Sequence, residues 1–482
     1  IAISPMNLFY CFIGVVLGTL IGVLPGIGPT AGCAMLIPFT FSLNPTAGII
    51  IMAGIYYCAQ YGGSTTSILV NLPGESASVM TCLDGYQMAR KGRAGAALGM
   101  AAMGSFIAGT LGTVALTLVA PPLANFGLQF GPPEYFSLMA VGMSLIVALV
   151  GHSIIKGLIA GAFGIFLGTV GIDPLCGVER FTYGIPTLFD GIGFVSVSVG
   201  LFAIAEVLDS AEQSLSTPSY IDKISNLLPN LKDWKDSALP IIRGTVIGFF
   251  VGALPGGGAT ISSLLSYAVE KKVSKHPERF GTGAIEGVAG PESANNSATS
   301  GAMVPLLTLG LPGSPPTAIM LAALLVHGLR PGPMLFTQHP DFVWGVIASM
   351  YIGNVMLLIL NLPLVGLWAR LLKVPQPLLL PLILAFSVVG VYTVSYSLVE
   401  VWIMFVFGII GYFMKKFDFP PAPIVLAIVL TPMMERALQQ SLVISHHDVS
   451  IFFTRPISLI LMIIAVLSIL NPFIRYLWAK AK

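Results

Sequence analysis

Long, almost unbroken apolar segments recur along this chain and predict helices that cross a membrane. Runs of about 18 or more apolar residues are long enough to span the hydrocarbon core of a bilayer. Clear examples are 94–120, 342–364, 378–391 with its continuation past Tyr396, and 457–470. A transmembrane β-barrel would instead show alternating segments of about ten residues, a pattern that this sequence lacks. The hydropathy pattern therefore predicts an all-α polytopic membrane protein.

Composition and charge agree with this class. Of the 482 residues, 55% are hydrophobic and 9% are charged, with a mean hydropathy of +0.89, whereas a soluble domain carries about 25% charged residues. The net charge of +2 gives no indication of nucleic-acid binding. The five cysteines show no CxxC spacing and are interpreted as small apolar residues of a helix bundle. The sequence contains neither a GxxxxGK[ST] phosphate loop nor an HExxH motif, and we expect no enzyme activity.

Two copies of one sequence pattern divide the chain. The segment "FIGVVLGTLIGVLPGIGPT" (12–30) matches "RGTVIGFFVGALPGGGAT" (243–260) in the spacing of its glycines and its proline. Further on, "NLPG" (71–74) pairs with "GLPG" (310–313). These matches predict a first repeat over residues 1–210, a polar cytoplasmic linker over 211–240, a second repeat over 241–445, and an outer loop with one extra C-terminal transmembrane helix over 446–482.

Basic residues in the short loops predict that the two repeats have opposite orientations in the membrane. Cytoplasmic loops of membrane proteins collect Lys and Arg. In the first repeat the basic loops are 90–93 and 152–156, and their counterparts in the second repeat carry only Arg330. In the second repeat the basic loops are 271–279, 370–373 and 415–416, whose first-repeat counterparts hold one arginine among them. Equivalent loops are therefore expected on opposite faces, and the repeats are predicted to be inverted.

Each repeat carries two predicted helix breaks. Proline and glycine remove helix hydrogen bonds, which is costly in lipid and so indicates a functional role. The first breaks are predicted tips of re-entrant hairpins, near 25–30 and near 255–260. The second are predicted broken helices near 60–74 and near 290–313, interrupted at "QYGGSTTS" and "PESANNSATS". Paired broken helices in inverted repeats point to the binding site of a secondary transporter.

These breaks supply backbone amides, hydroxyls and side-chain amides but no basic residue. Free N–H groups at helix N-termini favour anions, whereas unwound carbonyls and hydroxyls suit Na⁺. The breaks therefore predict a site for a small carboxylate with a coupling cation, Na⁺ at the hairpin tips or H⁺; no other cofactor is expected. The predicted substrate- and ion-binding residues are Pro25, Gly26, Gly28, Thr30, Ser64, Thr65, Thr66, Pro255, Gly256, Gly257, Gly258, Thr260, Glu292, Ser293, Asn295, Asn296, Ser297, Pro312 and Gly313.

Several of these residues have a second interpretation. Glycines at the tips can serve close helix packing instead of binding. Glu292 can cap a half-helix, or it can carry a coupling proton or cation. Glu206 and Glu435 are interpreted as interfacial residues at helix ends, and the pair His446–His447 as part of a solvated outer loop rather than a metal site.

Four motifs carry a family resemblance that covers nearly the whole chain. They are "GVLPGIGPTAG", "LPGESASVMTCLDGYQMARKGRAGAALG", "FGPPEYFSLMAVGMSLI" and "AGPESANNSATSGAMVPLLTLGLPGSP". They closely resemble the large membrane subunit of the bacterial tripartite tricarboxylate transporters. The resemblance implies a protein of the bacterial inner membrane that works with a small transmembrane subunit and a periplasmic substrate-binding protein. It also implies ion-driven uptake of citrate, other di- or tricarboxylates, aromatic acids or amino acids.

The expected function is therefore that of a cation-coupled carboxylate symporter subunit that works by elevator-like alternating access, surrounded by membrane lipid. The alternative is a stand-alone carboxylate symporter or exporter without a periplasmic binding protein. A channel would need a continuous polar pore, whereas polarity here is concentrated at four breaks. Helices near 135–150 and 381–391 are expected to form a static scaffold while the hairpins and broken helices move.

Overall fold

Helices make up nearly all of the fold in a computed structural model, which describes residues 2–24, 28–40, 43–149, 153–173, 177–212, 226–371 and 376–480. Within these ranges, seven helical segments are long and apolar enough to cross a membrane. The prediction of an all-α polytopic membrane protein is thereby confirmed. The strands in the described part of the chain are two short segments, β1 (Gly171–Ile172) and β2 (Glu179–Arg180), which pair antiparallel.

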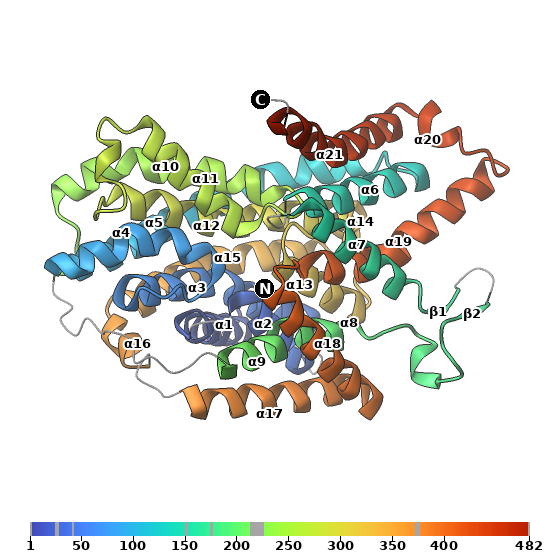
Figure 1. The fold of residues 1–482 in the computed structure, drawn as a ribbon, viewed down its shortest axis with the longest axis horizontal. Helices are drawn as coiled ribbons and strands as arrows, with labels where there is room; N and C mark the ends of the chain where they lie inside the picture. Colours follow the sequence, from blue (N-terminus) through green and yellow to red (C-terminus); the bar gives the residue numbers. More distant parts are fainter. Residues whose placement is uncertain are drawn as a thin grey trace.

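The helices follow in a similar order in the two halves of the chain (Figure 1). The first half holds α1 (Pro5–Val23), α2 (Gly28–Thr40), α3 (Pro45–Val70), the short 3₁₀ helix η1 (Ser76–Ser78), α4 (Val79–Met88), the π-helical turn η2 (Ala89–Arg93), α5 (Ala94–Gly127), α6 (Pro132–Leu149), α7 (Ile154–Gly168), η3 (Pro186–Leu188), α8 (Phe194–Ser198), the π-helical turn η4 (Val199–Ile204) and α9 (Ala205–Glu212). The second half holds α10 (Leu231–Ala253), α11 (Gly258–Val273), η5 (Pro277–Arg279), α12 (Glu286–Leu309), α13 (Pro315–Val326), α14 (Pro333–Gln338), α15 (Pro340–Asn361), α16 (Val365–Leu371), α17 (Gln376–Ser395), α18 (Leu398–Lys416) and α19 (Ala422–Ile444). Two further helices follow, α20 (Ile451–Thr454) and α21 (Pro456–Lys480).

The first helix of the second half begins inside the segment predicted as a linker. The Asn230 side chain accepts a hydrogen bond from the Asp233 backbone N–H, and the Asp233 side chain accepts one from the Asn230 N–H. This reciprocal capping is a strong signal for a helix start. α10 then continues through Pro240. The linker therefore ends at Asn230 rather than at residue 240, and its residues 213–225 lie outside the described ranges.

The breaks after α3 and α12 lie later than predicted. α3 is continuous through "QYGGSTTS" and α12 through "PESANNSATS". Within α3, the Ser64 hydroxyl donates to the Gln60 carbonyl oxygen of its own helix at 3.2 Å. α3 is followed by Asn71 with a φ of 60°, and α12 by Gly310 with a φ of 70°. Left-handed residues of this kind end helices, and a proline shortly after prevents their continuation. The interruptions therefore fall at "NLPG" and "GLPG".

Glycine contacts pack the first helix of each half against the third. At Gly22 of α1, an added Cβ would lie 2.2 Å from the carbonyl oxygen of Ala59 in α3. At Gly252 of α10, it would lie 2.4 Å from the carbonyl oxygen of Ala298 in α12. Small residues let transmembrane helices approach this closely. Both halves thus use the same kind of contact to hold the hairpin against the helix that follows it.

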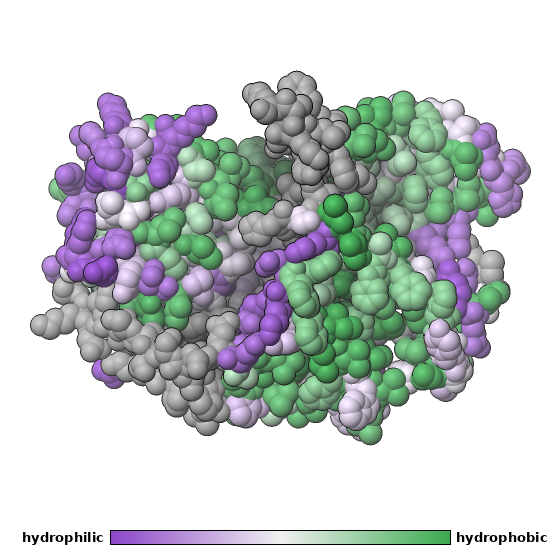
Figure 2. All heavy atoms as spheres, viewed as in Figure 1, coloured by the Kyte–Doolittle hydropathy of each residue, from purple (hydrophilic) through white to green (hydrophobic). Residues whose placement is uncertain are grey.

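Hydrophilic residues gather at the two ends of the long axis and in a narrow band near the middle of the view, and hydrophobic residues cover much of the face between them (Figure 2). At the end where α4 and the α11–α12 connection lie, Lys91 Nζ donates to the Thr282 carbonyl oxygen at 2.6 Å. At the other end, Arg180 of β2 lies 2.5 Å from Glu435 of α19. Two of the loops predicted to be cytoplasmic, 90–93 and 271–279, therefore lie at the same end of the molecule.

We expect single cysteines at Lys91 and Lys272 to react with a membrane-impermeant maleimide only from the cytoplasmic side. Both positions belong to the same basic end of the molecule, and basic loops stay in the cytoplasm. The measurement is labelling of whole cells and inverted vesicles in a background without reactive native cysteines. A cysteine at His446, in the loop at the opposite end, is the control and should react only from outside. Labelling of Lys91 and Lys272 from opposite faces would contradict the inverted arrangement.

Candidate functional site

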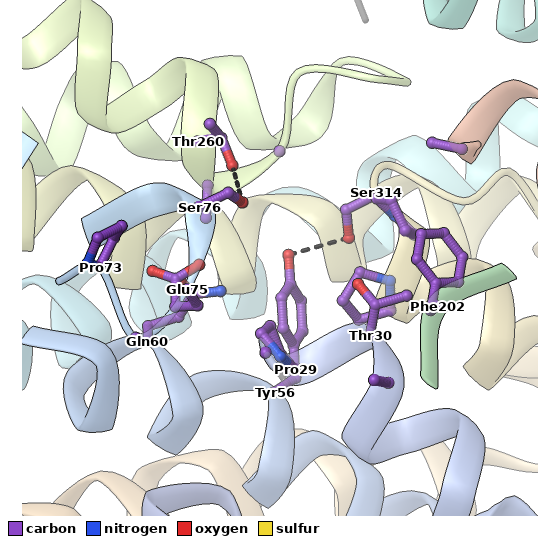
Figure 3. Close-up of a pocket in the computed structure, with 18 of the residues that line it drawn as sticks. Pro29, Thr30, Tyr56, Gln60, Pro73, Glu75, Ser76, Phe202, Thr260 and Ser314 are labelled. Atoms are coloured by element: carbon purple, nitrogen blue, oxygen red, sulfur yellow. Dashed lines mark hydrogen bonds between the residues drawn. The ribbon is translucent and has the colours of Figure 1, made fainter. Parts of the chain in front are cut away.

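A cavity of about 760 Å³ lies where the breaks of the two halves converge (Figure 3). One part of its wall comes from the first residues of α2 and α11. Another part comes from the "LPG" segment and cap after α3 (72–76) and from the cap and first residues of α13 (314–316). The remaining wall comes from Tyr56 and Gln60 of α3, Phe202 of η4, Glu206 and Ser210 of α9, Lys415 of α18 and Ala422 of α19. Segments far apart in the sequence therefore form one site.

Four helices begin at this cavity. The first residues of α2, α11, α13 and η1, which are Gly28, Gly258, Pro315 and Ser76, all line it. Gly28 and Gly258 have φ values of 62° and 53°, a conformation that glycine adopts without strain and that turns the chain into each helix. Helix N-termini present free N–H groups and a partial positive charge. α13 begins with two prolines, which have no N–H, and the Ala77 N–H of the short η1 is bonded to Glu75. The N-termini of α2 and α11 are therefore the ones that make the cavity suited to an anion.

The two "LPG" breaks bring matching helix caps to the cavity. Glu75 follows "NLPG" and caps η1, because its side chain accepts from the Ala77 backbone N–H at 2.9 Å. Ser314 follows "GLPG" and begins α13 in a capping box with Thr317. Glycine before each cap allows close approach: a Cβ at Gly74 would lie 2.2 Å from the Gly22 carbonyl oxygen. The break after the third helix is therefore packed directly against the hairpin.

Hydroxyl groups from different elements meet at the cavity. Ser76 Oγ lies 2.7 Å from Thr260 Oγ1, and Tyr56 OH lies 2.9 Å from Ser314 Oγ (Figure 3). Thr30 lines the cavity from α2, as Thr260 does from α11. A hydroxyl can donate to a carboxylate oxygen or present its own oxygen to a cation. The cavity thus offers both kinds of partner that the sequence analysis expected.

Part of the predicted site is brought together here. Gly28, Thr30, Gly256, Gly257, Gly258 and Thr260 line the cavity. Pro255, Pro312 and Gly313 are buried and do not line it, although the Gly256 N–H donates to the Gly313 carbonyl oxygen at 3.1 Å and so ties the hairpin tip to the break after α12. Pro25 and Gly26 lie outside the described residues.

The polar residues of α12 form a separate buried cluster around Glu292. The Glu292 carboxylate is fully buried and accepts from Ser64 Oγ at 2.5 Å and from Thr81 Oγ1. Asn295 Nδ2 lies 3.4 Å from the same carboxylate, and Asn296 Nδ2 donates to Asn295 Oδ1 at 2.7 Å. None of these residues lines the cavity. Because Glu292 lies well inside the unbroken α12, it does not cap a half-helix.

The remaining predicted residues of α3 and α12 are buried in helix contacts. Thr66 Oγ1 donates to the Val23 carbonyl oxygen at 2.6 Å, which joins α3 to α1. Ser297 Oγ donates to the Thr245 carbonyl oxygen at 2.8 Å, which joins α12 to α10. Thr65 and Ser293 are buried as well, and neither lines the cavity. Among the described residues, no group of three or more His, Cys, Asp or Glu is arranged to hold a metal ion.

Sequence reasoning missed several residues that line the cavity. They are Tyr56, Gln60, Glu75, Ser76 and Ser314. A signal for Glu75 and Ser314 is present in the sequence, since each directly follows an "LPG" break and begins the next helix. Tyr56 and Gln60 lie one helical turn apart in the buried α3, and polar side chains at membrane depth normally face a cavity or a partner.

Among the described residues that line the cavity, Lys415 of α18 is the only basic one. Its Nζ lies 2.8 Å from Glu206 Oε2 and 2.5 Å from Asp209 Oδ2. Glu206, interpreted from the sequence as interfacial, thus lines the cavity beside it. Because two carboxylates offset the charge of Lys415, the preference of the cavity for anions depends on backbone N–H groups and hydroxyls.

Comparison with known proteins identifies related chains. The family model described as the Tripartite tricarboxylate transporter TctA family matches residues 8–426. An uncharacterized 52.8 kDa protein in the TAR-I ttuC' 3' region of Agrobacterium vitis is 48% identical over 457 residues, which cover 95% of this chain and 91% of that protein. An uncharacterized protein in the TAR-II ttuC' 3' region of the same organism is 45% identical over 231 residues, which cover 47% of this chain and 96% of that protein. No solved structure matches the chain.

Proposed function

This chain belongs to the tripartite tricarboxylate transporter TctA family, and we propose that it is the large membrane subunit of a secondary transporter that imports small carboxylates. The observation that carries the proposal is that the N-termini of α2 and α11, one from each half of the chain, meet at one cavity. Backbone N–H groups there can bind carboxylate oxygens without a free Lys or Arg. A volume of about 760 Å³ also falls within the range of about 300–1,000 Å³ that small-molecule pockets occupy.

A cation gradient, of Na⁺ or H⁺, is proposed to drive this uptake. This proposal is supported by Glu292, a fully buried carboxylate whose hydrogen-bond partners are two hydroxyls and an amide. Among the described residues, no Lys, Arg or His side chain forms an ion pair with Glu292. A buried carboxylate without such a partner is costly unless a proton or a cation neutralises it. The hydroxyls of Thr30 and Thr260 offer further oxygen ligands for Na⁺ at the hairpin tips.

Elevator-like alternating access is proposed as the mechanism, because the cavity wall comes from two sets of helices. The hairpins, α3, residues 72–76 and residues 314–316 supply one side, and η4, α9, α18 and α19 supply the other. Sliding of the first set against the second would carry a bound substrate across the membrane without forming a continuous pore.

The family is named for a three-part system, so partner subunits belong to the proposal. They are a small transmembrane subunit and a periplasmic substrate-binding protein, assembled with this chain in the bacterial inner membrane. The alternative, a stand-alone symporter or exporter, predicts full transport by this chain without a binding protein.

Uptake by cells that produce this chain with its two partner subunits provides the test. Labelled citrate or another carboxylate of a tested panel should accumulate when a Na⁺ or H⁺ gradient is imposed, and ATP depletion should have no effect while the gradient is clamped. Failure to accumulate any carboxylate of the panel would reject the substrate class. Uptake that stops when only ATP is removed would reject the secondary mechanism.

Thr260→Val should raise the half-saturation concentration for the transported carboxylate about tenfold or more. The substitution keeps the shape of the side chain but removes a cavity hydroxyl, and one hydrogen bond to a charged group contributes about 1.5–3 kcal/mol. Thr110→Val is the matched control, because the Thr110 hydroxyl donates to the Phe106 carbonyl oxygen of its own helix and does not line the cavity. If both variants and the natural protein have the same half-saturation concentration, Thr260 does not contribute to the binding site.

A further inference from the structure

A buried carboxylate, Glu75, faces the cavity in which the proposed anionic substrate binds (Figure 3). The residue is 7% exposed, and one of its carboxylate oxygens accepts from the Ala77 N–H at 2.9 Å. With the amide of Gln60 oriented so that its nitrogen faces the carboxylate, this nitrogen donates to Glu75 Oε1 at 2.9 Å. The carboxylate is thus held in a defined position by neutral donors.

Glu75 has no basic partner among the ion pairs of the described residues. Lys415 lines the same cavity but is paired with Glu206 and Asp209. The charge of Glu292 in α12 acts on Glu75, and the charge of Glu75 acts in turn on Tyr56 of α3. Neither of them can supply a positive charge. A carboxylate in this position therefore lacks the compensation that a buried charge requires.

Helix capping alone does not explain a carboxylate at position 75. In the second half, Ser314 occupies the matching place: it follows "GLPG", lines the same cavity and begins α13 in a capping box. Serine is as good a helix cap as an acidic residue. Since a neutral hydroxyl is sufficient at one break, the negative charge at the other break indicates an additional role.

We propose that Glu75 binds the coupling cation, Na⁺ or H⁺, beside the substrate in the cavity. This inference rests on the carboxylate transport proposed above. A substrate carboxylate at the N-termini of α2 and α11 brings a second negative charge into the cavity, and like charges in a partly desolvated site repel each other. One cation at Glu75 removes this repulsion. Substrate and cation therefore strengthen each other's binding, as linkage requires, and this coupling favours transport of the two together.

The test compares Glu75→Gln and Glu75→Ser with the natural protein, each assembled with its partner subunits. Glu75→Gln keeps the size and the acceptor oxygen, and Glu75→Ser reproduces the neutral cap that the chain itself uses at position 314. Half-saturation for the transported carboxylate is measured while Na⁺ concentration and pH are varied separately. In the natural protein the half-saturation concentration should fall tenfold or more as the concentration of one of the two cations rises, and this result identifies the coupling ion. Both variants should bind the carboxylate equally well at every Na⁺ concentration and pH, and should exchange it without accumulating it.

Glu292→Gln tests the competing site, because Glu292 is another buried carboxylate without a basic partner and does not line the cavity. If this variant loses the dependence of substrate binding on the cation while both Glu75 variants keep it, the inference is wrong. Glu75 variants that insert and assemble but bind no carboxylate under any condition overturn it too, since a neutral residue should not weaken binding of an anion. Absence of carboxylate uptake by the natural protein would instead reject the proposed transport function.

Discussion

Gly252→Ala should lower the thermal stability of the protein and remove most of its transport activity. The added Cβ would lie 2.4 Å from the carbonyl oxygen of Ala298 and 2.6 Å from its Cα. Both are backbone atoms of α12 and cannot rotate away, so α10 and α12 have to move apart. Overpacking of a tight contact lowers the free energy of unfolding by about 1–3 kcal/mol. Because two helices have to move apart here, we expect a loss at the upper end of this range.

The effect on transport follows from the place of Gly252 next to the cavity. Its carbonyl oxygen lies 2.7 Å from the position of a Cβ on Gly313, and the Gly313 carbonyl accepts from the Gly256 N–H. A displaced α10 therefore moves the hairpin tip, which supplies Gly256 and Thr260 to the cavity wall. We expect uptake to fall at least tenfold, which corresponds to about 1.4 kcal/mol of lost binding or activation free energy.

The chain offers a matched control for this substitution. Gly366 of α16 has open space around the position of its Cβ. Gly366→Ala should therefore leave uptake unchanged and leave the unfolding temperature equal or slightly higher, because alanine favours helix more than glycine. Gly22→Ala should behave like Gly252→Ala, since the first half uses the same contact. A Gly252→Ala protein with unchanged unfolding temperature and uptake would show that this close helix approach is dispensable.

Asn296→Ala should reduce uptake about ten- to a hundred-fold while the protein still inserts and assembles. Its Nδ2 donates to Ser105 Oγ of α5 at 2.8 Å and to Asn295 Oδ1 at 2.7 Å. Each buried polar group left without its partner costs about 1–3 kcal/mol. Because Asn295 in turn contacts the Glu292 carboxylate, the loss disturbs the buried cluster that supports the proposed cation coupling, and Asn295→Ala should have a similar effect.

Thr308→Val is the control on the same helix. The Thr308 hydroxyl is fully buried and donates to the Val304 carbonyl oxygen, a bond within α12 that involves no other helix. This variant should transport at the natural rate. If Asn295→Ala and Asn296→Ala both keep the natural half-saturation and maximal rate, the polar cluster of α12 serves packing rather than transport.

The sequence alone determined the class of the protein and the local breaks from which the cavity is built. Long apolar runs predict membrane helices wherever they fold, because lipid accepts no unpaired backbone groups. The tips at Gly28 and Gly258 are local features as well, because "PGIG" and "PGGG" each combine a proline with several glycines, whereas a single proline such as Pro240 lies inside a continuous helix. Thr30 and Thr260 were found for this reason: they directly follow those breaks and line the cavity.

The tertiary structure alone decided which polar residues of the continuous helices face the cavity. Residues 287–308 of α12 are all buried, so the order of polar and apolar positions along this helix names no exposed face. Only the packing of α3, α4 and α5 around α12 places Glu292 and Asn296 in a sealed cluster. Packing likewise turns Glu75 and Gln60 toward the cavity. A helix buried on every side takes the roles of its side chains from its neighbours, and those contacts join segments hundreds of residues apart in the chain.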